Sequence, residues 1–142
     1  MINDKMNDYI KDYGPEQVEL PINQLALMNK NFRASIWTGN HMQVTIMSIN
    51  PRDDIGVEIH EDIDQILFVA RGRASVYSGN TEDTLTFKNN VNTGDMITIP
   101  AKTWHNIVNV GFSPLKLISV YAPVKHPYGT LQKTKQDAEH EE

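Results

Sequence analysis

The most informative pattern of the chain lies at residues 94–109, which read Gly94-Asp-Met-Ile-Thr-Ile-Pro-Ala-Lys-Thr-Trp-His-Asn-Ile-Val-Asn109. Gly94 and the aspartate after it favour a turn into a short strand, 96–99. Pro100 ends that strand because proline has no backbone N–H to donate to a sheet. The next three residues turn the chain back, so His105 lies near the start of the following strand. The pattern therefore predicts two consecutive strands, with a histidine at the beginning of the second.

Outside this stretch the chain continues in short runs rich in Val, Ile, Thr and aromatic residues, and clusters of Gly, Pro, Asn and Asp separate the runs. The predicted strands are residues 32–38, 42–49, 56–60, 65–70, 74–77, 84–88, 96–99, 104–110 and 115–121. About nine short strands at a spacing of roughly 8–12 residues, with no helical pattern between them, are typical of an antiparallel sandwich or barrel. We therefore predict an all-β fold.

The two ends differ from this strand-rich middle. Apolar residues at helical spacing predict a short amphipathic helix near the N-terminus: Met6, Tyr9, Ile10 and Tyr13, with Asn3 as its cap and Gly14-Pro15 as its stop. Residues 133–142 are charged and lack periodicity, which predicts a solvated tail. We divide the chain into an N-terminal helix and arm (1–31), a barrel (32–124) and a C-terminal loop and tail (125–142).

The composition limits the kinds of site that the chain can build. Its 142 residues include 13 basic and 18 acidic side chains, five histidines and no cysteine, for a formal charge of −5. Without cysteine there can be no disulfide scaffold, no thiolate nucleophile and no zinc site with sulfur ligands. Any metal must be held by nitrogen and oxygen atoms.

The charge and hydropathy patterns also bear on partners and location. The mild acidity, without a cluster of Lys and Arg, argues against binding to nucleic acid or to an anionic membrane surface. No run approaches the roughly 18 apolar residues that would span a bilayer, and the charged N-terminus does not match a secretory signal. We expect a cytoplasmic protein that binds neither nucleic acid nor membranes.

The pattern at residues 94–109 resembles the second signature motif of the cupin superfamily, in which a glycine and a proline are separated by five residues and are followed by a second glycine, a histidine and an asparagine. Gly94, Pro100, His105 and Asn109 match, and Lys102 stands where the family has the second glycine. The chain is similar to small bacterial type-2 cupins of the mannose-6-phosphate-isomerase-like group over residues 32–121. The resemblance implies a jelly-roll barrel (a double-stranded β-helix), a divalent metal with His105 as a ligand, and often a dimer.

The first cupin motif is only partly present. The family usually shows two histidines one residue apart, then a glutamate and a glycine, whereas this chain has Glu58, His60, Gln65 and Gly72 at the corresponding positions. Of the three ligand positions of the motif, only the second histidine is retained, as His60. This departure puts the metal and the chemistry implied by the resemblance in question, so the residues need an argument of their own.

Strand geometry supplies that argument, because residues i and i+2 of a strand share a face. Glu58 and His60 therefore project together, Gln65 on the next strand can lie across from them, and His105 joins them from the second motif. Two imidazoles, one carboxylate and one amide oxygen suit Fe(II), Mn(II), Ni(II) or Zn(II). The alternative is that Glu58 and His60 form the solvent face of a half-buried strand.

The other three histidines have weaker claims to a role. His126 lies with Tyr128 in a loop bounded by proline and glycine after the last strand, where it can act as a lid or contact a ligand, or lie on the surface. His41 follows a Thr-Gly-Asn turn and His140 belongs to the tail, so we expect neither to bind a metal.

Three functions are compatible with these observations. The first is a metal-dependent enzyme that acts on a small polar molecule, such as a sugar or a hydroxy-carbonyl compound, by isomerase or dioxygenase chemistry. The second is a module that binds a small ligand without catalysis, and the third is a structural cupin without metal. We also expect a homodimer, because the N-terminal apolar stripe and the strand 42–49 expose more apolar surface than a small barrel needs.

Overall fold

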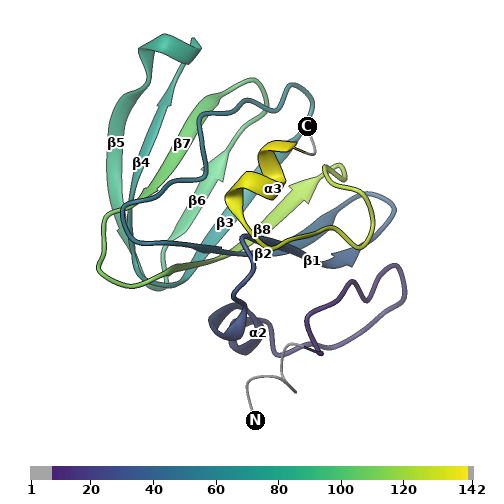
Figure 1. The fold of residues 1–142 in the computed structure, drawn as a ribbon. Helices are drawn as coiled ribbons and strands as arrows, with labels where there is room; N and C mark the ends of the chain where they lie inside the picture. Colours follow the sequence, from purple (N-terminus) through teal and green to yellow (C-terminus); the bar gives the residue numbers. More distant parts are fainter. Residues whose placement is uncertain (1–7, 141–142) are drawn as a thin grey trace.

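The computed structural model describes residues 8–140 and shows a two-sheet β structure with short helices at its ends (Figure 1). The elements are α2 (Ile22–Met28), β1 (Arg33–Thr38), β2 (Gln43–Ile49), β3 (Asp64–Arg71), β4 (Arg73–Gly79), the 3-10 helix η1 (Glu82–Thr84), β5 (Thr86–Asn92), β6 (Met96–Ile99), β7 (Trp104–Asn109), β8 (Leu115–Ala122), β9 (Leu131–Gln132) and α3 (Lys135–His140). The predicted all-β fold is confirmed.

The strands form two antiparallel sheets. One has six strands in the order β6-β3-β8-β2-β1-β9, and the other has three in the order β5-β4-β7. Gly72 links β3 to β4, and its φ of +119° is one that only glycine adopts without strain. Neighbours in the sheet that are distant in sequence, such as β3 and β8, give the jelly-roll connectivity expected of a cupin barrel.

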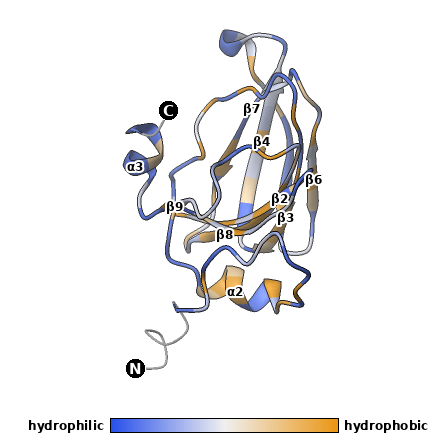
Figure 2. Ribbon diagram, turned by 90° about the vertical axis from the view of Figure 1, so that its right-hand side faces the viewer, coloured by the Kyte–Doolittle hydropathy of each residue, from blue (hydrophilic) through white to orange (hydrophobic). Residues whose placement is uncertain are grey.

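The core lies between the two sheets and follows the alternation of the strands. In β3 the residues Gln65, Leu67 and Val69 are buried while Ile66 and Phe68 are exposed, so one face of the strand lines the interior. A second apolar cluster lies on the outer face of the six-stranded sheet, where α2 packs Leu25 and Ala26. Figure 2 shows α2 beneath that sheet, on the side away from the three-stranded sheet.

The described part of the predicted N-terminal helix, residues 8–13, is not helical. Part of that prediction, residues 1–7, lies outside the described residues, and residues 8–13 form turns and irregular backbone. The reason is tertiary: the backbone N–H of Tyr13 donates to the carbonyl of Ile36, and the Asp12 carboxylate accepts hydrogen bonds from Ser35 and Thr38. These contacts hold the segment along β1. Among the described residues before β1, the helix is α2.

The C-terminal end is more ordered than the predicted solvated tail. β9 pairs with β1, and α3 buries Ala138 against the main core. Lys135 of α3 forms ion pairs with Asp53, at 3.2 Å, and with Asp54. A charged segment without apolar periodicity is thus docked by one small residue and two ion pairs. The domain boundaries at residues 31 and 124 stay predictions.

The predicted strand 56–60 is not a regular strand, and pairs with β7 through a single bridge between Glu58 and His105. Among residues 8–140, no helix has the length and apolar character needed to cross a membrane.

Candidate metal centre

Backbone pairing brings Glu58 and His105 opposite each other. The N–H of each residue donates to the carbonyl of the other at 3.0 Å, which is the hydrogen-bonded pairing of an antiparallel ladder. Side chains of such a pair project to the same face, and His60, two residues after Glu58, shares that face. The carbonyl of His60 is fixed in turn by the N–H of Lys102, at 2.7 Å.

Lys102 has a φ of +66°, in the left-handed region that favours glycine. This explains why the motif that the segment resembles has a glycine at this position. The turn keeps its shape with lysine, at the cost of some backbone strain, because its N–H is held by His60.

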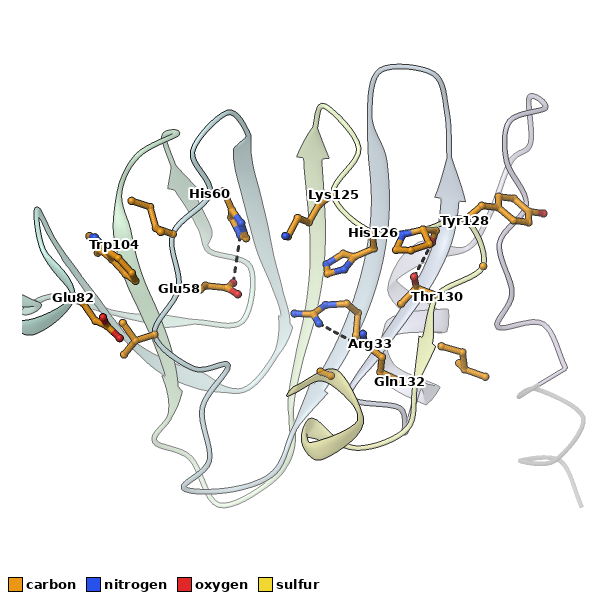
Figure 3. Close-up of a pocket in the computed structure, with 16 residues that line it drawn as sticks. Arg33, Glu58, His60, Glu82, Trp104, Lys125, His126, Tyr128, Thr130 and Gln132 are labelled. Carbon is orange, nitrogen blue, oxygen red and sulfur yellow. Dashed lines mark hydrogen bonds and ion pairs between the residues drawn. The ribbon is translucent and has the colours of Figure 1, made fainter. Parts of the chain in front are cut away.

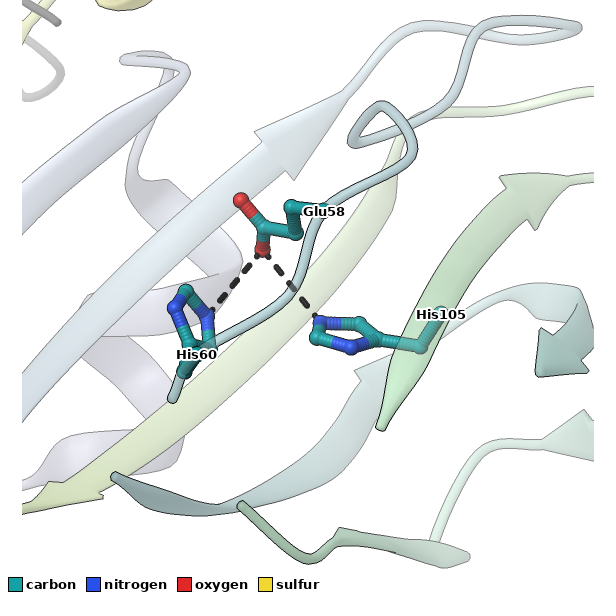
Figure 4. A group of neighbouring side chains, drawn as sticks. All are labelled: Glu58, His60 and His105. Atoms are coloured by element: carbon teal, nitrogen blue, oxygen red, sulfur yellow. Dashed lines mark ion pairs between the residues drawn. The ribbon is translucent and has the colours of Figure 1, made fainter. Parts of the chain in front are cut away.

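The three side chains converge on one point (Figure 4). Oε1 of Glu58 lies 3.4 Å from Nε2 of His60 and 3.5 Å from Nε2 of His105. One ligand atom from each residue lies within 4.8 Å of the others, close enough to hold a metal ion. The sequence-predicted trio Glu58, His60 and His105 is therefore brought together, from the β2–β3 connection and from β7.

The histidine rings are oriented as metal ligands would be. His105 is 2% exposed, and its Nδ1 lies 2.9 Å from the carbonyl of Thr103. A carbonyl can only accept, so a ring that binds a metal through Nε2 would keep its proton on Nδ1, facing Thr103. The Nε2 atoms of His60 and His105 are buried and have no hydrogen-bond partner among the described residues. Buried polar atoms without partners are uncommon, and an ion between them would satisfy both.

Glu58 supplies the negative charge of the site. Burial alone would raise the pKa of its carboxyl group, but the imidazoles of His105 and His60 lower that pKa by more, so it lies well below its ordinary range. Glu58 is therefore ionised at neutral pH. Two imidazoles and one carboxylate make the composition of a 2-His-1-carboxylate site.

Gln65 lies on the interior face of β3 and is 3% exposed. Its Nε2 donates to Oγ of Ser119 at 2.8 Å, while its Oε1 is buried without a hydrogen-bond partner among the described residues. An amide oxygen in this state is available as a ligand. That Gln65 binds the metal stays a prediction.

A cavity of about 1050 Å³ opens beside the trio (Figure 3). Glu58 and His60 form one part of its wall, and the loop with His126 and Tyr128 forms another. The structure thus brings the predicted loop residues to the same cavity as the predicted ligands. The Tyr128 hydroxyl is turned to the N-terminal arm, where it donates to the carbonyl of Asp12.

His126 is held tightly in this loop. Gln43 fixes its backbone through two hydrogen bonds of 2.9 Å, one to the N–H and one to the carbonyl. Its ring packs edge-on against Tyr121, with 5.2 Å between ring centroids, and Tyr121 in turn packs against His60. Burial, together with the positive charges of Arg33 and Lys125, lowers the pKa of His126 from 6.5 to about 3. His126 is a neutral imidazole at physiological pH.

Two histidines lie away from the site, whereas a buried arginine belongs to its wall. His41 and His140 are exposed and do not belong to the trio. Arg33 is 5% exposed and lines the cavity, and sequence reasoning did not single it out. The signal in the sequence that could have identified Arg33 was a charged residue within the predicted strand 32–38.

Comparisons with known proteins agree with the fold and the motif. The profile of the Cupin domain family matches residues 45–121. The chain is 48% identical over 132 residues to the uncharacterized protein YrkC of Bacillus subtilis, covering 93% of this chain and 71% of that protein. It is 38% identical to the uncharacterized protein L612 of Acanthamoeba polyphaga mimivirus, covering 78% of this chain and 68% of that one.

A solved structure gives the same result in three dimensions. The crystal structure of BH2720 from Bacillus halodurans superposes with a TM-score of 0.90 at 46% sequence identity, and the match covers 92% of this chain and 99% of that chain.

Proposed function

The chain belongs to the cupin family, and on that premise we propose that it is a divalent-metal-dependent enzyme acting on a small polar molecule bound in the cavity beside Glu58. The observation that supports the proposal most strongly is that the buried Nε2 atoms of His60 and His105 face an ionised carboxylate and have no hydrogen-bond partner in the described part of the chain. Fe(II), Mn(II), Ni(II) and Zn(II) all suit this set of nitrogen and oxygen ligands.

A bound metal would supply Lewis-acid chemistry or, with iron, redox chemistry. The residues of the chain have defined roles around it. Glu58 carries the ligand charge, the Thr103 carbonyl orients the His105 ring, and Tyr121 packs behind His60. We include Gln65 as a fourth ligand through its unpartnered Oε1. Replacing Gln65 with Glu should then tighten metal binding, whereas no change in affinity would remove Gln65 from the ligand set.

We favour dioxygenase-type over isomerase-type chemistry, because the imidazole on the cavity wall is a poor base. An isomerase needs a general base with a pKa near the working pH. His126, an imidazole on the wall beyond the ligands, has a pKa of about 3 and is a poor base at neutral pH. A dioxygenase needs the metal and a bound substrate and makes less demand on further side chains. We therefore assign His126 and Tyr128 to contact with the ligand or to closing the cavity mouth.

The test of this function is turnover by metal-loaded protein. Protein loaded anaerobically with Fe(II) is exposed to oxygen together with candidate hydroxy-carbonyl compounds, and oxygen consumption is recorded. Uptake that is lost in Glu58→Gln but kept in His41→Gln supports the dioxygenase. Exchange of solvent deuterium into a sugar by Mn(II)- or Zn(II)-loaded protein points instead to the isomerase. Metal binding with neither reaction refutes the enzyme and leaves the ligand-binding module.

The homodimer and the cytoplasmic location belong to the same proposal. An apolar groove lined by Val18, Leu20, Ile36, Val44 and Val120 on the outer face of the six-stranded sheet offers a surface for a second copy. Light scattering at micromolar concentration tests the dimer, and a monomeric mass would refute it.

A further inference from the structure

Arg33 is a buried cation that forms no ion pair within the described part of the chain. Its side chain is 5% exposed, and one terminal nitrogen donates to Oε1 of Gln132 at 2.7 Å. Its Nε is buried with no hydrogen-bond partner among residues 8–140, and no carboxylate of that part of the chain forms an ion pair with it. Burying a charge without a partner is costly, so such a group is expected to meet an anion.

The fold holds the guanidinium in place before any ligand arrives. Arg33 lies directly opposite Gln132 in the pairing of β1 with β9, and its guanidinium carbon lies 5.3 Å from the centre of the Phe32 ring. A planar guanidinium fixed in this way presents its remaining donors in a fork that matches the two oxygens of a carboxylate. Ordering the side chain in advance reduces the entropy cost of binding.

The position of Arg33 relates it to the candidate metal centre. Arg33 and Glu58 both line the 1050 Å³ cavity, and both also line an adjoining one of about 300 Å³. Figure 3 shows the guanidinium directed into the space that Glu58, Lys125 and His126 surround. Arg33 and Lys125 balance the two carboxylates of the same lining, Glu58 and Glu82, so a divalent metal at the trio would leave the space with net positive charge. An anionic ligand therefore suits this cavity better than a neutral one.

We propose that Arg33 binds the carboxylate of the ligand, and that the ligand is a small hydroxy or keto acid whose second oxygen donor faces Glu58, His60 and His105. The role of the second donor rests on the proposed metal function. The recognition of the carboxylate by Arg33 does not, because it depends on the guanidinium and the cavity alone. Arg33 thereby becomes the residue that selects acids over neutral sugars.

The experiment measures binding of lactate and pyruvate by calorimetry, with lactamide and glycerol as neutral counterparts and inorganic phosphate as a different anion. Each probe is titrated into metal-loaded and chelator-treated protein, and the metal content is determined in parallel. We expect the acids to bind and the neutral compounds not to. Arg33→Gln should weaken acid binding about 10- to 100-fold while leaving the metal content unchanged, as is typical for loss of a charge-assisted hydrogen bond. Arg73→Gln, an exposed arginine on β4, is the matched control.

A second variant covers the case in which Arg33→Gln does not fold. Gln132→Glu puts a carboxylate next to Arg33 and should compete with the ligand, so acid binding should fall while the protein stays folded. Equal acid binding in wild type and both variants would overturn the proposal, as would binding of phosphate or lactamide in preference to lactate. If the protein takes up no metal but binds lactate through Arg33, the carboxylate site stands and the metal function fails. If metal binds and no acid does, the metal function stands and the carboxylate site fails.

Discussion

Lowering the pH from 7 to 5 should reduce the free energy of unfolding by up to about 2 kcal/mol through His126 alone. The pKa of this imidazole falls from 6.5 to about 3 in the folded protein, first because it is buried and then because Arg33 and Lys125 are nearby. Between these two values the unfolded chain binds a proton that the folded chain does not. The stabilisation that comes from keeping His126 neutral is therefore fully present above the pKa of the unfolded chain, 6.5. It is lost as the pH falls from 6.5 towards the pKa of the folded chain, about 3.

The size of the effect follows from the two pKa values. At pH 5 nearly every unfolded chain carries the proton and nearly no folded chain does, whereas at pH 7 most chains of both states lack it. The difference amounts to about 2 kcal/mol, an upper value because the ring is half-buried and solvent screens part of the charge.

Urea unfolding of chelator-treated protein at pH 7 and pH 5 measures this effect without a contribution from metal release. We compare wild type with His126→Phe, which keeps a ring against Tyr121 but cannot titrate, and with His41→Gln as an exposed control. His126→Phe should lose about 2 kcal/mol less between the two pH values than wild type does. If the two proteins lose the same amount, His126 is not held neutral by its surroundings and the reasoning fails.

Three further substitutions test the fold around the site by urea unfolding at pH 7. Lys102→Gly should raise the unfolding free energy by up to about 1 kcal/mol, because glycine relieves the strain of a φ of +66°. Lys102→Ala should not raise it, and a lower unfolding free energy with glycine would contradict the reasoning. Asp12→Ala should lower it by about 1–3 kcal/mol, because the carboxylate accepts hydrogen bonds from Ser35, Thr38 and Gly129, and an unchanged value would show that these contacts contribute nothing. Leu67→Ala should cost about 2–5 kcal/mol at a fully buried site in β3, and a cost below about 1 kcal/mol would contradict the packing described.

The strands in the middle of the chain could be predicted from the sequence because they depend on residues that are close together in it. The alternation of β3 and the turn at Gly72 specify strands and their faces, and the spacing from Gly94 to Asn109 places His105 near the start of its strand. Strand geometry predicted that Glu58 and His60 share a face, and the resemblance to the second cupin motif assigned His105 to the same site; the structure brings all three together.

The features that escaped prediction depend on contacts between distant segments. Residues 8–13 are not helical because Asp12 binds to residues of β1, and α3 is held by ion pairs of Lys135 with residues more than 80 positions away. Arg33 enters the cavity wall because β9 pairs beside it. The periodicity of a sequence does not predict such contacts between distant segments.

The central claim is that Glu58, His60 and His105 hold a divalent metal ion, and metal stoichiometry tests it most directly. Protein purified in the absence of chelator is loaded in turn with Fe(II), Mn(II), Ni(II) and Zn(II), desalted, and measured by elemental mass spectrometry. The account predicts close to one ion per chain in wild type and in His41→Gln. It also predicts an affinity at least about 100-fold lower in Glu58→Gln and His105→Gln, which each lose a direct ligand. Wild-type protein that stays metal-free after loading, or variants that bind the ion as tightly as wild type, would contradict the account.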